Sequence, residues 1–252
     1  MNIRQIRNAT MIINYANKTF LIDPFLAKKG AYPPFPNTLN QDTFNPTVDL
    51  PIPIEEIIDA DVVIVTHLHP DHFDAAAIEV LPKAIRIIAQ SEEDVAVIKK
   101  AGFQNVQSID RISSIDGISL TRTNGKHGIG EIGKMMGEVS GVVFNHPDEK
   151  TLYLAGDTIW CNDVEDSIRL HHPEVIIVNG GAAQFLQGDP IIMTKEDIYQ
   201  TYLEAPQSTI IVSHMEALNH CLLTRSELKT FLDEKELSKH ILVPNDGESI
   251  TF

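Results

Sequence analysis

The sequence predicts a layered α/β domain with mixed β-sheets. From residue 54 onward, apolar stretches of strand length alternate with amphipathic stretches of helix length. Pairs of strand-like stretches joined by short turns occur at the start of the chain and around residues 146–150. Interleaving of this kind predicts helices packed on sheets that contain both parallel and antiparallel neighbours. Because no linker interrupts the 252 residues, we expect a single domain over residues 1–252.

The N-terminal half is predicted to begin with a β-hairpin, because the strand-like residues 10–16 and 19–23 flank a short turn. Residues 28–53 are rich in proline, which disfavours a helix or a central strand, so we expect a surface loop there. Ser91 and Gly102 are the expected N-cap and stop of a helix. The other elements expected in this half are helices at 54–60, 73–81 and 92–101 and strands at 61–66 and 84–90.

The C-terminal half continues the alternation of strands and helices. A short turn at 146–150 joins two of the strands, which predicts an antiparallel pair. The last stretch, 240–252, is predicted to be a closing hairpin. The expected strands are 118–123, 137–145, 151–156, 174–180 and 208–214, and the expected helices are 162–170, 195–205 and 225–237.

The charge balance disfavours nucleic acid as a partner. The chain has 35 acidic and 20 basic residues, and its formal net charge of −15 repels phosphate backbones. The sequence shows no signal-peptide pattern and no apolar run of the ~18 residues that a membrane span needs. Cys161 and Cys221 have no CxxC spacing, so we expect two reduced thiols, although one disulfide is compatible with the sequence. We therefore expect a cytoplasmic protein that binds neither nucleic acid nor membrane, and a homo-oligomer is compatible with these features.

The strongest functional signal follows the predicted strand 61–66, where the chain reads HLHPDH. In an extended chain, residues two apart point to the same side, so His67 and His69 can face one point. Asp71 and His72 lie one turn further on and can face a neighbouring point. Imidazole and carboxylate groups are ligands of zinc and similar divalent metals. A histidine-rich surface loop is the alternative, but three of the ten histidines within six positions favour a metal site.

Three further candidate ligands, His127, Asp157 and His214, each stand at the end of a predicted strand. Sites in layered α/β proteins lie outside the carboxyl ends of strands, so this shared placement predicts that all three join the cluster. Taken singly, His127 could be a solvated loop residue, Asp157 a turn former or helix N-cap, and His214 a partner of a helix start. His146 lies in a turn at the opposite strand end, and we do not expect it to contribute.

The HLHPDH segment matches the HxHxDH signature of the metallo-β-lactamase superfamily, and the order of the three later ligands matches its remaining metal motifs. The stretches IRNATMIINYANKTFLIDPFL, LYLAGDTIW, VNGGAAQFLQGDPIIM and VPNDGESI resemble the branch related to ascorbate-6-phosphate lactonase. This resemblance implies an αββα sandwich, with two facing mixed sheets and the site at one edge. It also implies a first metal held by His67, His69 and His127, a second held by Asp71, His72 and His214, and Asp157 as the bridge between them.

The resemblance implies a metal-dependent hydrolase. Two divalent ions ~3.5–4 Å apart can share a water and lower its pKa toward neutrality. Asp71 is placed to orient that water or to accept its proton, which makes it the expected catalytic residue. We expect zinc, with manganese or iron as alternatives, and a small soluble lactone, ester or phosphoester as substrate. The candidate residues around the substrate are His220, Lys126, Gly181 and Asp23, the last as a contact of a ligand histidine.

Two other classes of function compete with this interpretation. A phosphodiesterase or nuclease acting on RNA or DNA could use the same ions, but the acidic charge and the missing basic stripe disfavour it. A non-catalytic metal-stabilised sensor would have its ions fully coordinated by protein, and the complete ligand set makes it the less favoured class. The proline-rich segment 28–53 could cover the mouth of the site or form a subunit contact.

Overall fold

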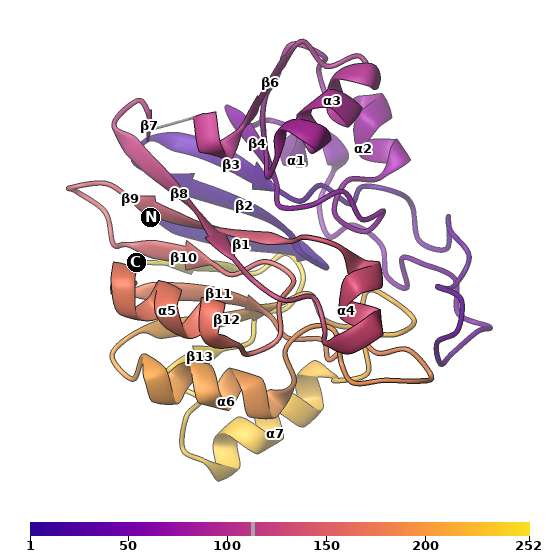
Figure 1. Cartoon of the computed structure of the whole chain (residues 1–252), viewed down its shortest axis with the longest axis vertical. Helices are drawn as coiled ribbons and strands as arrows, with labels where there is room; N and C mark the ends of the chain where they lie inside the picture. The colour runs from indigo at the N-terminus through magenta and orange to yellow at the C-terminus, as the bar shows by residue number, and fades with distance from the viewer. Residues whose placement is uncertain (112–113) are drawn as a thin grey trace.

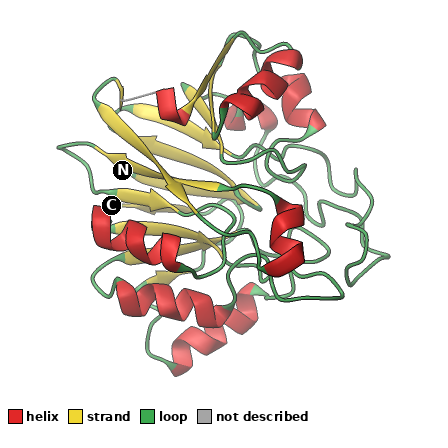
Figure 2. Cartoon of the chain, in the orientation of Figure 1, coloured by secondary structure: helices red, strands yellow, loops and turns green. Residues whose placement is uncertain are grey.

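The computed structural model describes residues 1–111 and 114–252. Two β-sheets face each other at the centre of the molecule, and helices cover their outer faces (Figure 1). Colouring by secondary structure shows the same layers, with the sheets lying between two groups of helices (Figure 2). This αββα order confirms the predicted fold class. Within the described part of the chain, no helix combines the length and apolar character needed to cross a membrane.

The first sheet has seven strands among the described residues, in the order β14-β1-β2-β3-β4-β5-β6. β1, β2 and β3 form an antiparallel meander that contains the predicted N-terminal hairpin, whereas β3 to β6 run parallel. The strands are β1 (Asn2–Arg7), β2 (Thr10–Tyr15), β3 (Lys18–Ile22), β4 (Val62–Val65), β5 (Arg86–Ala89), β6 (Asn105–Ser108) and β14 (Ser249–Thr251).

The second sheet also has seven strands in the described ranges, in the order β13-β12-β11-β10-β9-β8-β7. Neighbours from β7 to β10 are antiparallel, and neighbours from β10 to β13 are parallel. Both sheets are therefore mixed, as predicted. The strands are β7 (Ser114–Ile115), β8 (Ile118–Asn124), β9 (Ser140–Asn145), β10 (Leu152–Leu154), β11 (Val175–Asn179), β12 (Thr209–Ser213) and β13 (Ile241–Leu242).

The helices connect the parallel strands and begin at residues suited to capping. The Ser91 hydroxyl accepts a hydrogen bond from the Asp94 backbone N–H, which confirms the predicted N-cap. Thr194 and Thr224 form capping boxes at the starts of two later helices. The helices are α1 (Ile54–Ile57), α2 (Ala75–Val80), α3 (Glu92–Lys100), α4 (Gly130–Met136), α5 (Asn162–His171), α6 (Lys195–Glu204), α7 (Arg225–Glu234) and the 3-10 helix η1 (Ile109–Arg111).

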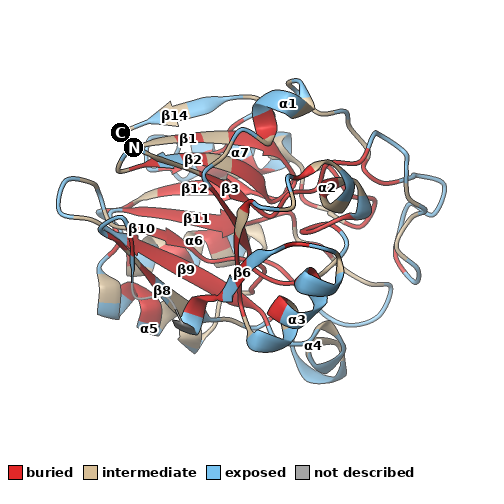
Figure 3. Cartoon of the chain, turned by 90° about the horizontal axis from the view of Figure 1, so that it is seen from above, coloured by how far each residue is buried: buried red, intermediate tan, exposed pale blue. Residues whose placement is uncertain are grey.

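Three of the four apolar clusters among the described residues join the layers. The central cluster lies between the sheets, where the rings of Phe20 and Phe144 meet edge to face at 5.2 Å. A second cluster packs α5 to α7 against the second sheet, and a third packs α1 to α3 against the first. Figure 3 shows the resulting pattern, with buried strands in red and exposed helix surfaces in pale blue. The continuous apolar strands of the sequence are thus buried on both faces.

One predicted element is wrong. Residues 240–252 do not form a hairpin, because β13 pairs parallel with β12 in the second sheet whereas β14 pairs antiparallel with β1 in the first. The segment looks like a hairpin because a proline–glycine-rich turn separates two short apolar stretches. Each stretch finds a longer partner elsewhere. β1, β6 and α4 were not predicted, since their short polar or glycine-containing sequences carry little periodicity.

The strand directions bring several strand ends to one edge of the sandwich. β3 and β4 run parallel in the first sheet. In the second sheet β10, β11 and β12 run parallel, and β8 has the same direction because it is separated from β10 by the antiparallel β9. The segments that follow these strands therefore meet outside the carboxyl ends, the usual position of a site in layered α/β proteins.

Candidate metal centre

Seven imidazole and carboxylate side chains gather at this edge in two groups. The first consists of His67, His69 and His127, and the second of Asp71, His72, Asp157 and His214. Within each group, the potential ligand atoms lie within 4.8 Å of one another. These are the two ligand sets that the sequence resemblance implies, with Asp157 falling in the second group. The segment after β4 and the ends of β8, β10 and β12 deliver them.

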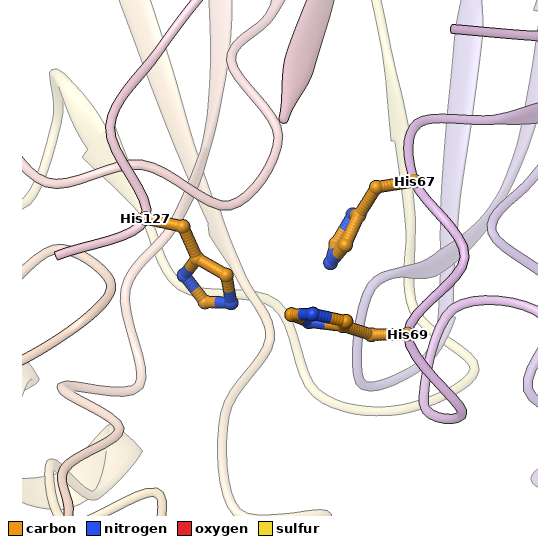
Figure 4. A group of neighbouring side chains, drawn as sticks. All are labelled: His67, His69 and His127. Atoms are coloured by element: carbon orange, nitrogen blue, oxygen red, sulfur yellow. The ribbon is translucent and has the colours of Figure 1, made fainter. Parts of the chain in front are cut away.

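The first group consists of three histidine rings that face one another (Figure 4). The ring centroids of His67 and His69 lie 4.4 Å apart, and those of His69 and His127 lie 5.1 Å apart. The Nδ1–H of His127 donates to the Ile191 carbonyl at 2.8 Å. That bond leaves the Nε2 lone pair of His127 free to face the other rings, which is how a metal-binding histidine is usually fixed.

The second group is tied together by short polar contacts. His72 Nε2 lies 3.2 Å from Asp157 Oδ2, and His214 Nε2 lies 3.1 Å from Asp71 Oδ2. All four side chains are buried. Buried charges need partners, so this arrangement stabilises both carboxylates as anions.

Asp157 occupies the position between the two groups. Its Oδ2 lies 3.9 Å from His67 Nε2 and 3.5 Å from His127 Nε2 in the first group, and 3.6 Å from His214 Nε2 in the second. Its other oxygen accepts a hydrogen bond of 2.6 Å from the Asn179 amide. One oxygen is thus held by the protein while the other faces both groups, and a bridging role for Asp157 stays a prediction.

Asp23 orients two histidines of the cluster from behind. Its carboxylate accepts the Nδ1–H of His72 at 2.9 Å and the Thr66 hydroxyl at 2.7 Å. Since that hydroxyl donates to Asp23, its oxygen is left to accept from Nδ1 of His67, 3.2 Å away. Both histidines therefore turn Nε2 toward the cluster. A carboxylate behind a metal-binding histidine fixes its tautomer and raises its basicity.

The buried surroundings divide the histidines into two electrostatic classes. Burial lowers the pKa of His67 and of His127, which keeps both rings neutral. Burial also disfavours charge on His72, but Asp157, Asp23 and Asp71 outweigh it and raise its pKa to about 10. For His214, the same opposition, led by Asp157, leaves the pKa well above its usual value.

The two carboxylates respond in the opposite direction. Burial alone would raise the pKa of Asp157, but His72 and His214 hold it well below its usual range. The pKa of Asp71 is also lowered, because the same two histidines outweigh its burial. Both groups are anionic at neutral pH, as metal coordination requires.

The residues fit a divalent metal. Nitrogen and carboxylate oxygen are the donor types that zinc and similar ions take. Among the described residues, the buried Nε2 of His67 has no hydrogen-bond partner, although it points into the cluster. A buried polar atom without a partner costs ~1–3 kcal/mol, and a cation at this position would supply the missing interaction.

The backbone around His214 is arranged for close approach. His214 has a positive φ of 59°, a conformation that is uncommon outside glycine and recurs at functional sites. A Cβ on Gly181 would lie 2.2 Å from the His214 carbonyl oxygen. Only glycine allows the loop after β11 to pass this close to the ligand, so the structure gives Gly181 a packing role beside the cluster.

The structure places the other sequence-selected residues at different distances from the cluster. His220 is buried and lines a cavity beside it, and its Nδ1 has no partner among the described residues. Lys126 is exposed and lies outside the residues that line this cavity. His146 lies in the turn after β9, at the far end of that sheet, as expected.

A small cavity opens directly on the cluster. We call it the site cavity; its volume is about 120 Å³. The cluster residues form one wall, and most of the remaining lining is apolar, including Phe35, Met136, Phe185 and Ile191. Among the described residues that line it, none is a lysine or an arginine. The cavity therefore offers an uncharged surface next to the candidate metal ligands.

Several residues that organise the site were not found by sequence reasoning. Asn179 ends β11 and could have been found by the same strand-end argument that found Asp157. Asn8 donates to Asp71 Oδ2 at 3.3 Å, and Phe35 lines the site cavity. Neither stands at a predicted strand end, so no comparable signal marks them.

A helix-covered sandwich of two mixed sheets, with a buried imidazole and carboxylate cluster at its carboxyl edge, defines a candidate metalloenzyme of the αββα type. Residues 18–215 match the Beta-lactamase superfamily domain. The chain belongs to the metallo-β-lactamase superfamily.

Relatives of similar length support this assignment. The UPF0173 protein YddR of Bacillus subtilis (strain 168) is 54% identical over 254 residues and is covered completely, as is this chain. A UPF0173 metal-dependent hydrolase of Pyrococcus abyssi is 30% identical over 239 residues, covering 93% of this chain and 92% of that protein.

Two solved structures superimpose on nearly the whole chain. The isothiocyanate hydrolase from Delia radicum gut bacteria has 43% sequence identity and a TM-score of 0.96, covering 100% of this chain and 99% of its own. A possible metal-dependent hydrolase from Veillonella parvula DSM 2008 has 39% identity and a TM-score of 0.97, with the same coverage.

Proposed function

We propose that this protein hydrolyses small uncharged isothiocyanates, R–N=C=S, with two divalent metal ions held by the seven-residue cluster. The observation that carries the proposal is the site cavity, which is small, largely apolar and free of lysine and arginine among its described lining residues. An uncharged electrophile matches such a surface, whereas a phosphoester would leave its charge facing apolar side chains. The likeness to an isothiocyanate hydrolase over the whole chain supports this choice of substrate.

The metal ions are part of the proposal. His67, His69 and His127 would hold one ion, and Asp71, His72 and His214 the other, with Asp157 shared between them. Bound divalent ions lower the pKa of water and polarise the substrate atom that gains charge. Zinc is the ion we propose first, with manganese and iron as alternatives, because the donor set is mixed nitrogen and oxygen.

The chain's own residues supply the remaining chemistry. Water adds to the central carbon of R–N=C=S, and cleavage of the C–N bond of the resulting thiocarbamate releases the amine R–NH₂ and carbonyl sulfide. We assign proton acceptance from water to the carboxylate of Asp71, which lines the site cavity. His220 faces the same cavity, and burial lowers its pKa to about 4, so its neutral ring can donate a hydrogen bond to the substrate heteroatom.

Lactones and esters present a similar uncharged electrophilic carbon and form the second candidate class. They agree with the sequence resemblance to ascorbate-6-phosphate lactonase, a branch that stays a prediction. Phosphoesters and nucleic acids are less favoured, because the net charge is −15 and the described lining of the site cavity contains no lysine or arginine.

A substrate panel tests the proposal. Metal-free protein is reloaded with Zn²⁺, Mn²⁺ or Fe²⁺ and assayed on benzyl isothiocyanate, a γ-lactone, p-nitrophenyl acetate and bis-p-nitrophenyl phosphate. We expect metal-dependent release of benzylamine at the highest kcat/KM of the panel, and its loss together with bound metal in Asp157→Ala. Turnover of the phosphodiester with none of the isothiocyanate would refute the proposal, as would full activity of metal-free Asp157→Ala.

A further inference from the structure

A second apolar cavity lies beside the site cavity, under the proline-rich segment. We call it the side cavity; its volume is about 250 Å³. Its lining includes Phe25, Tyr32, Pro34 and Leu218. It shares Phe35, Pro70 and Asp71 with the site cavity, so the two spaces adjoin at the metal cluster.

We propose that the side cavity binds the hydrocarbon substituent of the substrate and thereby sets which substituents the enzyme accepts. This inference rests on the proposed function. The reacting group would lie in the site cavity against the metal ligands, and the substituent would extend past Phe35 and Pro70 into the side cavity.

The size and chemistry of the side cavity select the occupant. An apolar cavity of 150 Å³ is large enough to bind benzene. At about 250 Å³, the side cavity can take one aromatic ring with a short tether. Most of the lining is aromatic, proline or aliphatic, and the amide of Asn45 is already engaged with Asn219. The ionised Asp71 in the lining is already engaged with His214 and Asn8. A charged or strongly polar substituent would therefore lose its hydration without gaining a free partner.

The wall of the side cavity is fixed to the domain rather than free to move as a lid. Buried Asn219 accepts the Phe35 backbone N–H at 3.0 Å and donates to the Thr38 hydroxyl at 2.8 Å. The buried guanidinium of Arg7 donates to the carbonyls of Ala27 and Val48, at the two ends of the segment. Hydrogen bonds from Asn219 and Arg7 thus hold the long loop 28–53, purple in Figure 1, against the domain. A preformed pocket binds a substituent without a large ordering cost.

The same short stretch of chain serves both cavities. Leu218 lines the side cavity, and His220, two residues later, lines the site cavity. Phe35 lines both cavities, and its ring packs edge to face against the His220 ring with the ring centroids 4.7 Å apart. A substituent that fills the side cavity therefore also positions the reacting carbon relative to His220 and Asp71.

Substitution of Leu218 in both directions tests the inference on the metal-loaded full-length protein. The readout is the ratio of kcat/KM for benzyl isothiocyanate to that for methyl isothiocyanate. Burying a phenyl group predicts a ratio of about 10 to 150 for the wild type. Leu218→Trp fills the cavity and should bring the ratio close to one, whereas Leu218→Ala enlarges it and should favour 1-naphthylmethyl over benzyl isothiocyanate.

Leu203→Trp is the matched control, because Leu203 is exposed on α6 and lines neither cavity. It should leave the wild-type ratio unchanged. A folded Leu218→Trp protein with the wild-type ratio would overturn the inference, and folding is verified by its melting temperature and near-ultraviolet circular dichroism.

Benzene binding provides a readout that needs no turnover and no substitution. Metal-loaded wild-type crystals exposed to benzene should show the ring between Tyr32 and Leu218, and benzene should compete with benzyl but not methyl isothiocyanate. An empty side cavity at saturating benzene would overturn the inference. If no isothiocyanate is hydrolysed but benzene occupies the cavity, the proposed substrate fails while the hydrocarbon site stands.

Discussion

Replacing Asp23 with asparagine should weaken the metal centre without touching a metal ligand. The two Asp23 oxygens accept from the Thr66 N–H at 2.7 Å, and from the Thr66 hydroxyl and His72 Nδ1. In Asp23→Asn, one of these positions becomes an NH₂ group. If it faces His72, it donates to Nδ1 and forces the ring proton onto Nε2, where the lone pair is needed. If it faces the Thr66 N–H, two donors collide.

Either orientation removes at least one charge-assisted contact that fixes a ligand histidine. Loss of such a partner typically costs 10–100-fold in metal affinity or activity, which is ~1.4–2.8 kcal/mol. The backbone should tolerate the change, because Asp23 has a φ of 43° and asparagine readily adopts that conformation. We therefore expect an intact fold and weaker binding of the ion proposed at Asp71, His72 and His214.

The assay is titration of metal-free protein with Zn²⁺ against a chromophoric chelator, together with kcat/KM. In the zinc-loaded protein, imidazole ¹⁵N chemical shifts report whether Nδ1 of His72 carries the ring proton. Asp116→Asn is the matched control: Asp116 also has a positive φ, 48°, but its side chain is exposed and pairs with Lys18. Wild-type zinc affinity in Asp23→Asn, with an unchanged His72 tautomer, would refute this role for Asp23.

Three further predictions concern the cluster and its supports. The pKa values of His72 and His214 are raised, so both rings are protonated in metal-free protein at pH 7. Zinc binding should therefore release a proton from each ring and become tighter as pH rises. Calorimetry in buffers of different ionisation enthalpy measures the number of protons released, and zero release at pH 7 would contradict the prediction. Gly181→Ala should cost ~1–3 kcal/mol of stability and weaken metal binding, because the added Cβ would overlap the His214 carbonyl oxygen. An unchanged melting temperature of this variant would argue against that close approach. Asn219→Ala leaves the buried hydrogen-bond partners of Asn219 unsatisfied and should lower the free energy of unfolding by ~1–3 kcal/mol. Asn124→Ala, at an exposed position, is the control. Equal denaturation midpoints for the two variants would show that Asn219 does not anchor segment 28–53.

The gathering of the seven candidate ligands could be predicted because two independent signals agree. Residue type indicates metal chemistry, and placement after a strand indicates the carboxyl edge of a sheet. Asp157 illustrates the point: a lone aspartate after a glycine is weak, but its place after a buried strand puts it beside the histidines. The same argument applies to His127 and His214.

The parts that sequence reasoning missed depend on contacts between distant residues. Asn219 is an unremarkable amide in the sequence, and its role arises only because segment 28–53 folds against it. The predicted hairpin over residues 240–252 is wrong for a related reason. With two and three residues, β13 and β14 have no strong local preference, and pairing with β12 and β1 decides their positions.

Because the candidate ligands come from both sheets, metal binding and packing of the two sheets should depend on each other. The first sheet supplies His67, His69, Asp71 and His72, whereas the second supplies His127, Asp157 and His214. Each ligand group therefore contains residues from both sheets, and neither group is complete until the sheets face each other in the correct register. The hydrophobic core between the sheets must form for the cluster to exist, and a bound ion in turn stabilises that packed state over any state in which the sheets separate. Asp23 extends this coupling to the backbone, because it ends β3 and holds the first residues after β4, so the β3–β4 pairing itself orients His67 and His72.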